Sequence, residues 1–224
     1  MFAEFYDSFV QHPLLLWVAA VVGLAIALRR PGLRPSVRRF CVALTIVSLV
    51  DAWLTTNDVP GLGPLTGGAA TWVPLAFVLI GDFRYFLFIE SARRGGTLVF
   101  EARHVARALA WTLVVPIASQ LVTTAMGSTN SRVLFLVYEA LFVVLAIGIS
   151  AHYLPKHTET LAWTRGVTRF VIGYYALWAG ADAIILVTGA DAGFLLRVAP
   201  NILYYGGLVP VIAWTAPKMA RTKE

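Results

Sequence analysis

Seven stretches of mainly apolar residues run through this chain, and each is close to the length that a helix needs to cross a lipid bilayer. A membrane-spanning helix takes roughly 20 consecutive apolar residues. The stretches comprise residues 13–29, 39–56, 71–90, 106–126, 133–154, 168–188 and 195–216. The connections between them leave no length for a separate soluble domain. The sequence therefore predicts an all-α protein, a polytopic integral membrane bundle of seven transmembrane helices that forms a single domain over residues 1–224.

The composition excludes several classes of protein. Hydrophobic residues make up 58% of the sequence and charged residues only 13%, whereas about a quarter of a soluble domain is charged. The net charge of +6 does not indicate a nucleic-acid partner, because long apolar stretches separate basic residues that would have to share one water-exposed face. The single cysteine, Cys41, excludes an intrachain disulfide and a multi-cysteine metal site. The histidines lack metal-ligand spacing, so we expect no metal and no cofactor.

The distribution of basic residues predicts how the bundle lies in the membrane. Of the 18 Lys and Arg residues, 15 fall in connections and a tail that seven alternating spans place on one side. Cytoplasmic connections carry an excess of Lys and Arg, so the N-terminus is predicted to be outside and the C-terminus cytoplasmic, in a bacterial-type inner membrane. Glu4 and Asp7 precede the first span without any Lys or Arg, unlike the basic start of a signal peptide. We therefore expect this span to remain in the mature protein.

Polar residues within the spans are candidate functional residues, because an ionisable side chain in hydrocarbon costs about 2.5–3.5 kcal/mol on insertion scales. In the predicted topology those of six spans share the outer half of the membrane, which predicts a polar cavity that opens outward. They are Asp51, Asp82, Gln120, Glu139, Asp182 and Asn201. A purely structural interpretation fits four of them equally well. Asp51 and Glu139 can reach the outer interface, and Gln120 and Asn201 can hydrogen-bond neighbouring helices.

Asp82 and Asp182 are the predicted catalytic residues. Asp82 is too central to reach the interface easily, and Asp182 shares a helix face with Tyr175 and Trp178, which precede it by seven and four residues. One protonated and one ionised carboxyl group would form an acid/base pair. Arg84 lies on a different helix face from Asp82. We expect Arg84 to bind another carboxylate, a carbonyl group or the inner interface.

Aromatic residues within the spans are the remaining candidates for a binding pocket. Tyr174 and Tyr175 form one adjacent pair, and Tyr204 and Tyr205 form another. An aromatic pocket favours an apolar or cationic guest. We expect Tyr175, Trp178, Tyr204 and Tyr205 to contact a substrate, together with Asp51, Gln120, Glu139 and Asn201.

Two segments resemble a family of membrane enzymes. Leu79-Ile80-Gly81-Asp82 is similar to the Gly-Asp motif in an early span of YhhN-type lysoplasmalogenases, and Trp178–Leu186 with Tyr204-Tyr205 is similar to their later Ser-Asp span and Tyr-Tyr helix. The resemblance implies a small polytopic enzyme that hydrolyses the vinyl-ether bond of lysoplasmalogens, with Asp82 and Asp182 as its acid and base. The chain departs from the family pattern in having Gly180-Ala181 before the second Asp and seven spans instead of eight.

The leading functional prediction is a membrane-embedded enzyme that acts on a lipid or isoprenoid by carboxylate acid/base chemistry. Size and span number also resemble those of integral-membrane terpene cyclases, whose chemistry needs an intramembrane acid and aromatic faces. One alternative is a small-molecule or proton-coupled transporter with a 3+1+3 helix arrangement, favoured by the similarity of Val50–Leu54 to Ala181–Ile185. Another is a non-catalytic subunit of a membrane complex. Membrane lipids are the expected partners in each case.

Overall fold

The computed structural model describes residues 1–55 and 65–217, and this part of the chain is almost entirely helical. Three basic residues that contribute to the predicted topology, Lys218, Arg221 and Lys223, lie outside the described residues. The described residues include one two-stranded antiparallel hairpin, in which Ala92 pairs with Leu98. The predicted all-α class is therefore confirmed.

The elements follow one another in a simple order. They are α1 (Phe2–Phe5), η1 (Tyr6–Val10), α2 (Pro13–Leu28), α3 (Pro35–Leu54), α4 (Gly68–Ser91), β1 (Ala92–Arg93), η2 (Arg94–Gly96), β2 (Thr97–Leu98), α5 (Ala102–Ala125), α6 (Ser131–Gly148), η3 (Ile149–Tyr153), α7 (Leu154–His157), α8 (Leu161–Thr188), α9 (Gly193–Leu196), α10 (Val198–Ile202), η4 (Leu203–Gly207) and α11 (Leu208–Thr215).

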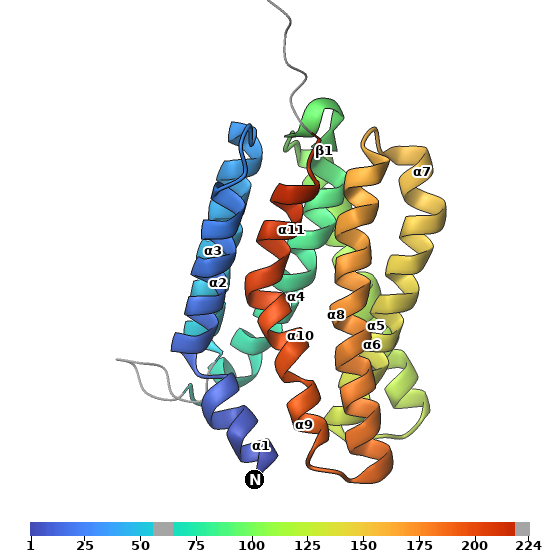
Figure 1. Cartoon of the computed structure of the whole chain (residues 1–224). Helices are drawn as coiled ribbons and strands as arrows, with labels where there is room; N and C mark the ends of the chain where they lie inside the picture. Colours follow the sequence, from blue (N-terminus) through green and yellow to red (C-terminus); the bar gives the residue numbers. More distant parts are fainter. Residues whose placement is uncertain (56–64, 218–224) are drawn as a thin grey trace, which may run out of the picture.

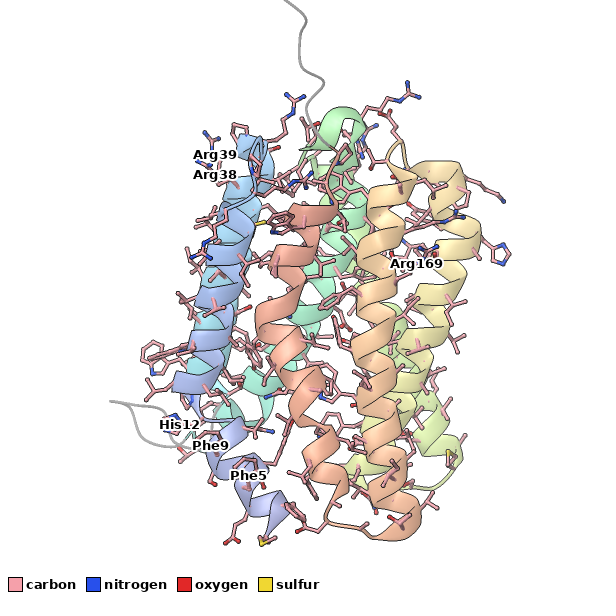
Figure 2. All side chains as sticks on the ribbon, in the orientation of Figure 1. Phe5, Phe9, His12, Arg38, Arg39 and Arg169 are labelled. Atoms are coloured by element: carbon pink, nitrogen blue, oxygen red, sulfur yellow. The ribbon has the colours of Figure 1, made fainter. Side chains whose placement is uncertain are left out.

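Successive long helices run in opposite directions, so their connections gather at two ends of the bundle (Figure 1). The N-terminus, the α5–α6 turn and the α8–α9 turn lie at one end, at the bottom of Figure 1, which we call the N-terminal end. The β1–β2 hairpin and α7 lie at the other, which we call the hairpin end. Figure 2 shows Arg38 and Arg39 at the hairpin end, and Phe5, Phe9 and His12 toward the N-terminal end.

Several helices are long and apolar enough to cross a membrane. Among the described residues, four qualify: Ala102–Ala125, Ser131–His157, Leu161–Thr188 and Gly193–Thr215. A fifth is possible if Phe2–Val10 and Pro13–Leu28, which meet at a 60° bend, form one broken span. These helices are consistent with an integral membrane protein. The seven crossings predicted from the sequence would require α3 and α4 to cross as well, although each carries three charged residues.

Large apolar side chains cover parts of the outer surface of the bundle. On α5, Leu109, Leu113, Ile117 and Leu121 follow one another at four-residue steps and are 50%, 48%, 58% and 66% exposed. Residues four apart lie on the same helix face, so these side chains form a continuous apolar stripe. Contiguous apolar patches are rare on soluble monomers and mark membrane or protein contacts.

Small residues bring α2 and η4 into close contact. A side chain on Gly23 would collide with the Gly206 carbonyl oxygen, and a Cβ atom on Gly206 would lie 2.6 Å from the Ala19 carbonyl oxygen. Small residues let helix backbones approach in this way within membranes, where packing replaces the hydrophobic effect as the force between helices. This contact holds the last helical segment against α2.

We expect Gly206→Val to destabilise the protein by about 1–3 kcal/mol, because overpacking a close backbone contact forces the two helices apart. Gly173→Ala is the matched control, since Gly173 lies within α8 with open space around it and Ala has the higher helix propensity. The midpoint of thermal unfolding in detergent, followed by circular dichroism, should fall for Gly206→Val and stay or rise for Gly173→Ala. Equal midpoints for the two variants would contradict the role of this contact.

Candidate functional site

A cavity of about 280 Å³ lies toward the N-terminal end of the bundle. Its lining comes from η1, α2, α3, α4, α6, α8, α10 and η4. Seven of the ten candidate residues line it: Asp51, Glu139, Tyr175, Trp178, Asn201, Tyr204 and Tyr205. The structure therefore brings most of the predicted binding residues to one cavity, and three candidates lie elsewhere.

Asp82 lies directly behind the cavity wall. Its side chain is 1% exposed, and its two carboxylate oxygens accept hydrogen bonds from the hydroxyl groups of Tyr138 on α6 and Tyr175 on α8. Both tyrosines line the cavity, and the Tyr175 ring stacks on Phe142 at 4.0 Å between centroids. Asp82 thus reaches the cavity through two tyrosines and not by direct contact.

Arg84 holds Tyr204, which lines the cavity. Its guanidinium donates to the Ser48 hydroxyl at 2.9 Å and to the Tyr204 carbonyl oxygen at 3.0 Å, and it lies 4.0 Å from the centroid of the Tyr204 ring. The carbonyl group was one of the three partners expected for Arg84. The hydroxyl of Tyr204 lies where a Cβ atom on Gly81 would be, so a larger residue at position 81 would displace this ring. Gly81 and Arg84 together fix the place of Tyr204.

Asp182 and Asp82 have different hydrogen-bond partners. Its side chain is fully buried, and its Oδ1 atom accepts from Nη1 of Arg132 at 2.9 Å and also from Nη1 of Arg197. Seven residues separate Asp182 from Tyr175 on α8, which is about 10.5 Å along a helix, and Tyr175 is the residue that binds Asp82. Among the described residues the two carboxyl groups have different partners: Asp182 belongs to a buried ion-pair cluster with two arginines, one of which, Arg197, lines the cavity. The acid/base pairing of Asp82 with Asp182 stays a prediction.

Glu139 lines the cavity with a carboxyl oxygen that is free, within the described chain, to bind a ligand. The side chain is 5% exposed and lines the cavity, yet its Oε2 atom has no hydrogen-bond partner within the described part of the chain. The indole nitrogen of Trp178, also in the lining, is buried without a partner in the same part of the chain. Buried polar groups are nearly always hydrogen-bonded, so these two groups are suited to receive a ligand or water.

The N-terminal segment covers the cavity. Tyr6 and Gln11 belong to the lining, and the Asn201 amide donates to the Val10 carbonyl oxygen at 3.4 Å. Asp191, in the α8–α9 turn, accepts from the backbone N–H groups of Phe2 at 2.6 Å and Ala3 at 2.9 Å. These two hydrogen bonds lower the pKa of the Asp191 carboxyl group, because they favour its charged form.

Gln120 is the clearest correction among the predicted binding residues. Its side chain is exposed on α5 and does not line the cavity. The neighbouring hydroxyl groups satisfy their own helix, because Ser119 donates to the Pro116 carbonyl oxygen at 3.0 Å and Thr123 donates to the Ser119 carbonyl oxygen at 2.9 Å. Of the six polar residues that the sequence predicts to share a cavity, Asp51, Glu139 and Asn201 line it, whereas Asp82, Gln120 and Asp182 do not.

The residues that sequence reasoning missed include Tyr138, Arg132 and Arg197. Helical spacing carried a signal for both arginines: Arg132 precedes Glu139 by seven residues, and Arg197 precedes Asn201 by four, so each pair lies on one face. A second polar cluster was also missed. Near the hairpin end, Glu90 accepts from the hydroxyl of Tyr153 at 2.6 Å and from the Trp111 indole nitrogen at 3.3 Å.

The lining combines carboxyl groups with aromatic faces. Asp51 and Glu139 supply the acids, and Tyr6, Tyr138, Tyr175, Trp178, Tyr204 and Tyr205 supply aromatic side chains. Across the described residues no group of three or more His, Cys, Asp or Glu side chains is placed to hold a metal ion. Carboxyl groups can transfer protons, and aromatic faces can stabilise a positive charge.

We expect Asp182→Asn to destabilise the protein by about 3–5 kcal/mol, because removing one partner of a buried ion pair leaves the remaining charge uncompensated. Arg197 is 16% exposed and would lose its carboxylate partner. Glu139→Gln is the matched control, since it neutralises a neighbouring carboxyl group without breaking an ion pair. The midpoint of thermal unfolding in detergent should fall much further for Asp182→Asn. A stable Asp182→Asn protein that has lost activity would instead restore Asp182 as a catalytic residue.

Comparisons with known proteins do not assign the chain to a family. No family model, curated protein or solved structure matches it. The residues that resemble lysoplasmalogenases have distinct places in the structure: Gly81 and Asp82 lie behind the cavity, and Tyr204 and Tyr205 line it.

Proposed function

We propose that all seven helical segments cross a bacterial-type inner membrane, with the N-terminus outside and the C-terminus cytoplasmic. The alternating direction of the long helices supports this arrangement (Figure 1). So does the distribution of charge: Arg38 and Arg39 lie at the hairpin end, as do Arg93 and Arg94 in the hairpin itself. The apolar stripe on α5 would face lipid.

Single cysteines at the two ends should react from opposite sides of the membrane. In a Cys41→Ser background, Thr129→Cys in the α5–α6 turn should be labelled by a membrane-impermeant maleimide added to intact cells. Lys156→Cys in α7 should react only after the membrane is permeabilised. The unmodified chain is the control, because Cys41 is fully buried. Labelling of both cysteines from the same side would overturn the topology.

We propose that the protein is a membrane-embedded enzyme that protonates an electron-rich carbon–carbon double bond in a lipid or isoprenoid. The observation that carries this proposal is the buried Glu139 carboxyl group in the cavity, with an Oε2 atom that has no partner in the described chain. Aromatic side chains line the same cavity, and such rings can stabilise the cation that protonation creates. A vinyl ether and an isoprenoid alkene are both substrates of this type.

Glu139 is the proton donor of this mechanism. Glu139, in its protonated form, donates its proton to a substrate carbon and leaves a cation at the adjacent carbon. For a vinyl ether, water then adds to the cation and gives its proton to a carboxylate, and the hemiacetal collapses to an aldehyde and an alcohol. For an isoprenoid, cyclisation ends when a neighbouring carbon returns a proton to a carboxylate. Asp82 is the positioning residue for the hydroxyl groups of Tyr138 and Tyr175.

Glu139→Gln should lower kcat by about 10²–10⁴-fold, the usual contribution of a general acid, while KM changes little because the amide keeps the shape of the side chain. The assay uses purified protein in vesicles with a vinyl-ether lysophospholipid and, separately, a linear polyprenyl alkene, and mass spectrometry detects the products. Gln120→Leu is the matched control, since Gln120 is an intramembrane polar residue outside the cavity.

Three other outcomes would overturn parts of this mechanism. If Glu139→Gln kept full turnover and Asp82→Asn abolished it, Asp82 would be the acid. If Gln120→Leu lost as much activity as Glu139→Gln, the cavity would not be the site of reaction. If the unmodified protein moved either compound across the vesicle membrane without converting it, the protein would be a transporter.

A further inference from the structure

A second and larger hollow lies between α3 and α4. Its volume is about 700 Å³, within the range of pockets that hold small organic molecules. Apolar side chains form most of its walls, among them Phe40 and Leu44 on α3 and Phe83 and Leu87 on α4. We call it the α3–α4 groove. It is separate from the cavity of the proposed reaction, and none of the candidate site residues lines it.

The hairpin closes the groove at one end. Ser36 accepts a hydrogen bond from the backbone N–H of Leu98 at 3.1 Å, and the rings of Phe40 and Phe100 lie 5.5 Å apart. All four residues belong to the lining. Contacts between α3 and the hairpin segment therefore build this end of the groove.

Two arginines at the same end are available to bind an anion. Arg39 lines the groove, and Arg38 precedes it on α3. Both are exposed at the hairpin end, as Figure 2 shows. The ion pairs in this region involve Arg94, Arg103 and Arg107, and neither Arg38 nor Arg39 has an acidic partner among the described residues.

The groove has the length of one leaflet of a bilayer. Its lining on α3 extends from Ser36 to Val47, which is about 16.5 Å at 1.5 Å per residue. The hydrocarbon core of a bilayer is roughly 30 Å thick, so the groove covers about half of it. Arg84 also lines the groove. Its guanidinium donates hydrogen bonds to the Ser48 hydroxyl and to the Tyr204 carbonyl oxygen.

We propose that the α3–α4 groove binds one acyl chain of an anionic phospholipid of the cytoplasmic leaflet, whose phosphate pairs with Arg39 and Arg38. This inference rests on the proposed orientation in the membrane, which places the hairpin end at the cytoplasmic surface. An apolar groove one leaflet deep fits an acyl chain, and two unpaired arginines at its mouth fit the lipid phosphate. Anionic lipids of this leaflet attract basic residues at the membrane surface.

The test is retention of lipid by the purified protein in nanodiscs of phosphatidylglycerol mixed with phosphatidylcholine, read by native mass spectrometry after release from the disc. The unmodified chain should retain one phosphatidylglycerol in preference to phosphatidylcholine. Arg39→Gln should weaken that preference about fivefold, the effect of roughly one basic residue at an anionic surface. Arg169→Gln is the matched control, because Arg169 is exposed on α8 and does not line the groove.

Filling the groove gives an independent test of the acyl chain. Ala43 is exposed in the groove lining, so Ala43→Trp should abolish retention of both lipids. Ala25→Trp, at an exposed position on α2 outside the groove, should retain lipid normally. Unchanged retention in Ala43→Trp, or equal preference in Arg39→Gln and Arg169→Gln, would overturn the proposal. So would a dimer that dissociates in Ala43→Trp, because the occupant would then be a second copy of the chain.

The outcome of this lipid-binding measurement does not depend on the proposed enzyme activity. It reads bound lipid and not turnover, and Glu139 does not line the groove. Glu139→Gln should therefore retain phosphatidylglycerol as the unmodified chain does. Normal retention with no turnover of any substrate would leave the lipid site intact and remove the enzyme mechanism alone.

Discussion

The buried carboxylate of Asp82 connects three helices, and the N-terminal half of the bundle is organised around it. A buried carboxyl group in an apolar interior must find hydrogen-bond partners or it destabilises the fold. Asp82 lies on α4 and obtains its donors from Tyr138 on α6 and Tyr175 on α8, which fixes how these three helices are rotated relative to one another. Because Glu139 follows Tyr138 directly, the same rotation determines where Glu139 meets the cavity. The reactive group of the proposed mechanism is thus placed by a carboxylate that does not touch the cavity.

Charged groups on the other helices are satisfied by different kinds of partner. Asp182 is neutralised by Arg132 and Arg197, whereas Arg84 relies on a hydroxyl group, a carbonyl oxygen and the face of the Tyr204 ring. A guanidinium group has several donors in a planar arrangement and can stack on an aromatic ring, so it can link α3, α4 and η4 without a carboxylate. The cavity and the α3–α4 groove are kept apart by this link.

Hydropathy predicted the positions of the helices along the chain well, and the partners of their polar residues poorly. An apolar stretch specifies length and approximate depth, so the helical segments and the gathering of Asp51, Glu139 and Asn201 at one level could be predicted. The rotation of each helix about its axis was harder, since weakly amphipathic membrane helices carry little periodic signal. Gln120 faces outward on α5, and Asp182 faces two arginines from other segments. Pairings between segments depend on packing that a single sequence does not contain.

One pair of side chains lies between the cavity and the α3–α4 groove. Arg84 lines the groove and Tyr204 lines the cavity, and the two side chains are in contact. A molecule that displaced the guanidinium from one side would move the tyrosine ring on the other. If such a displacement changed affinity, thermodynamic linkage would require the effect to be mutual, with each occupant altering the binding of the other by the same factor. The bilayer would then be an effector of this protein as well as its solvent.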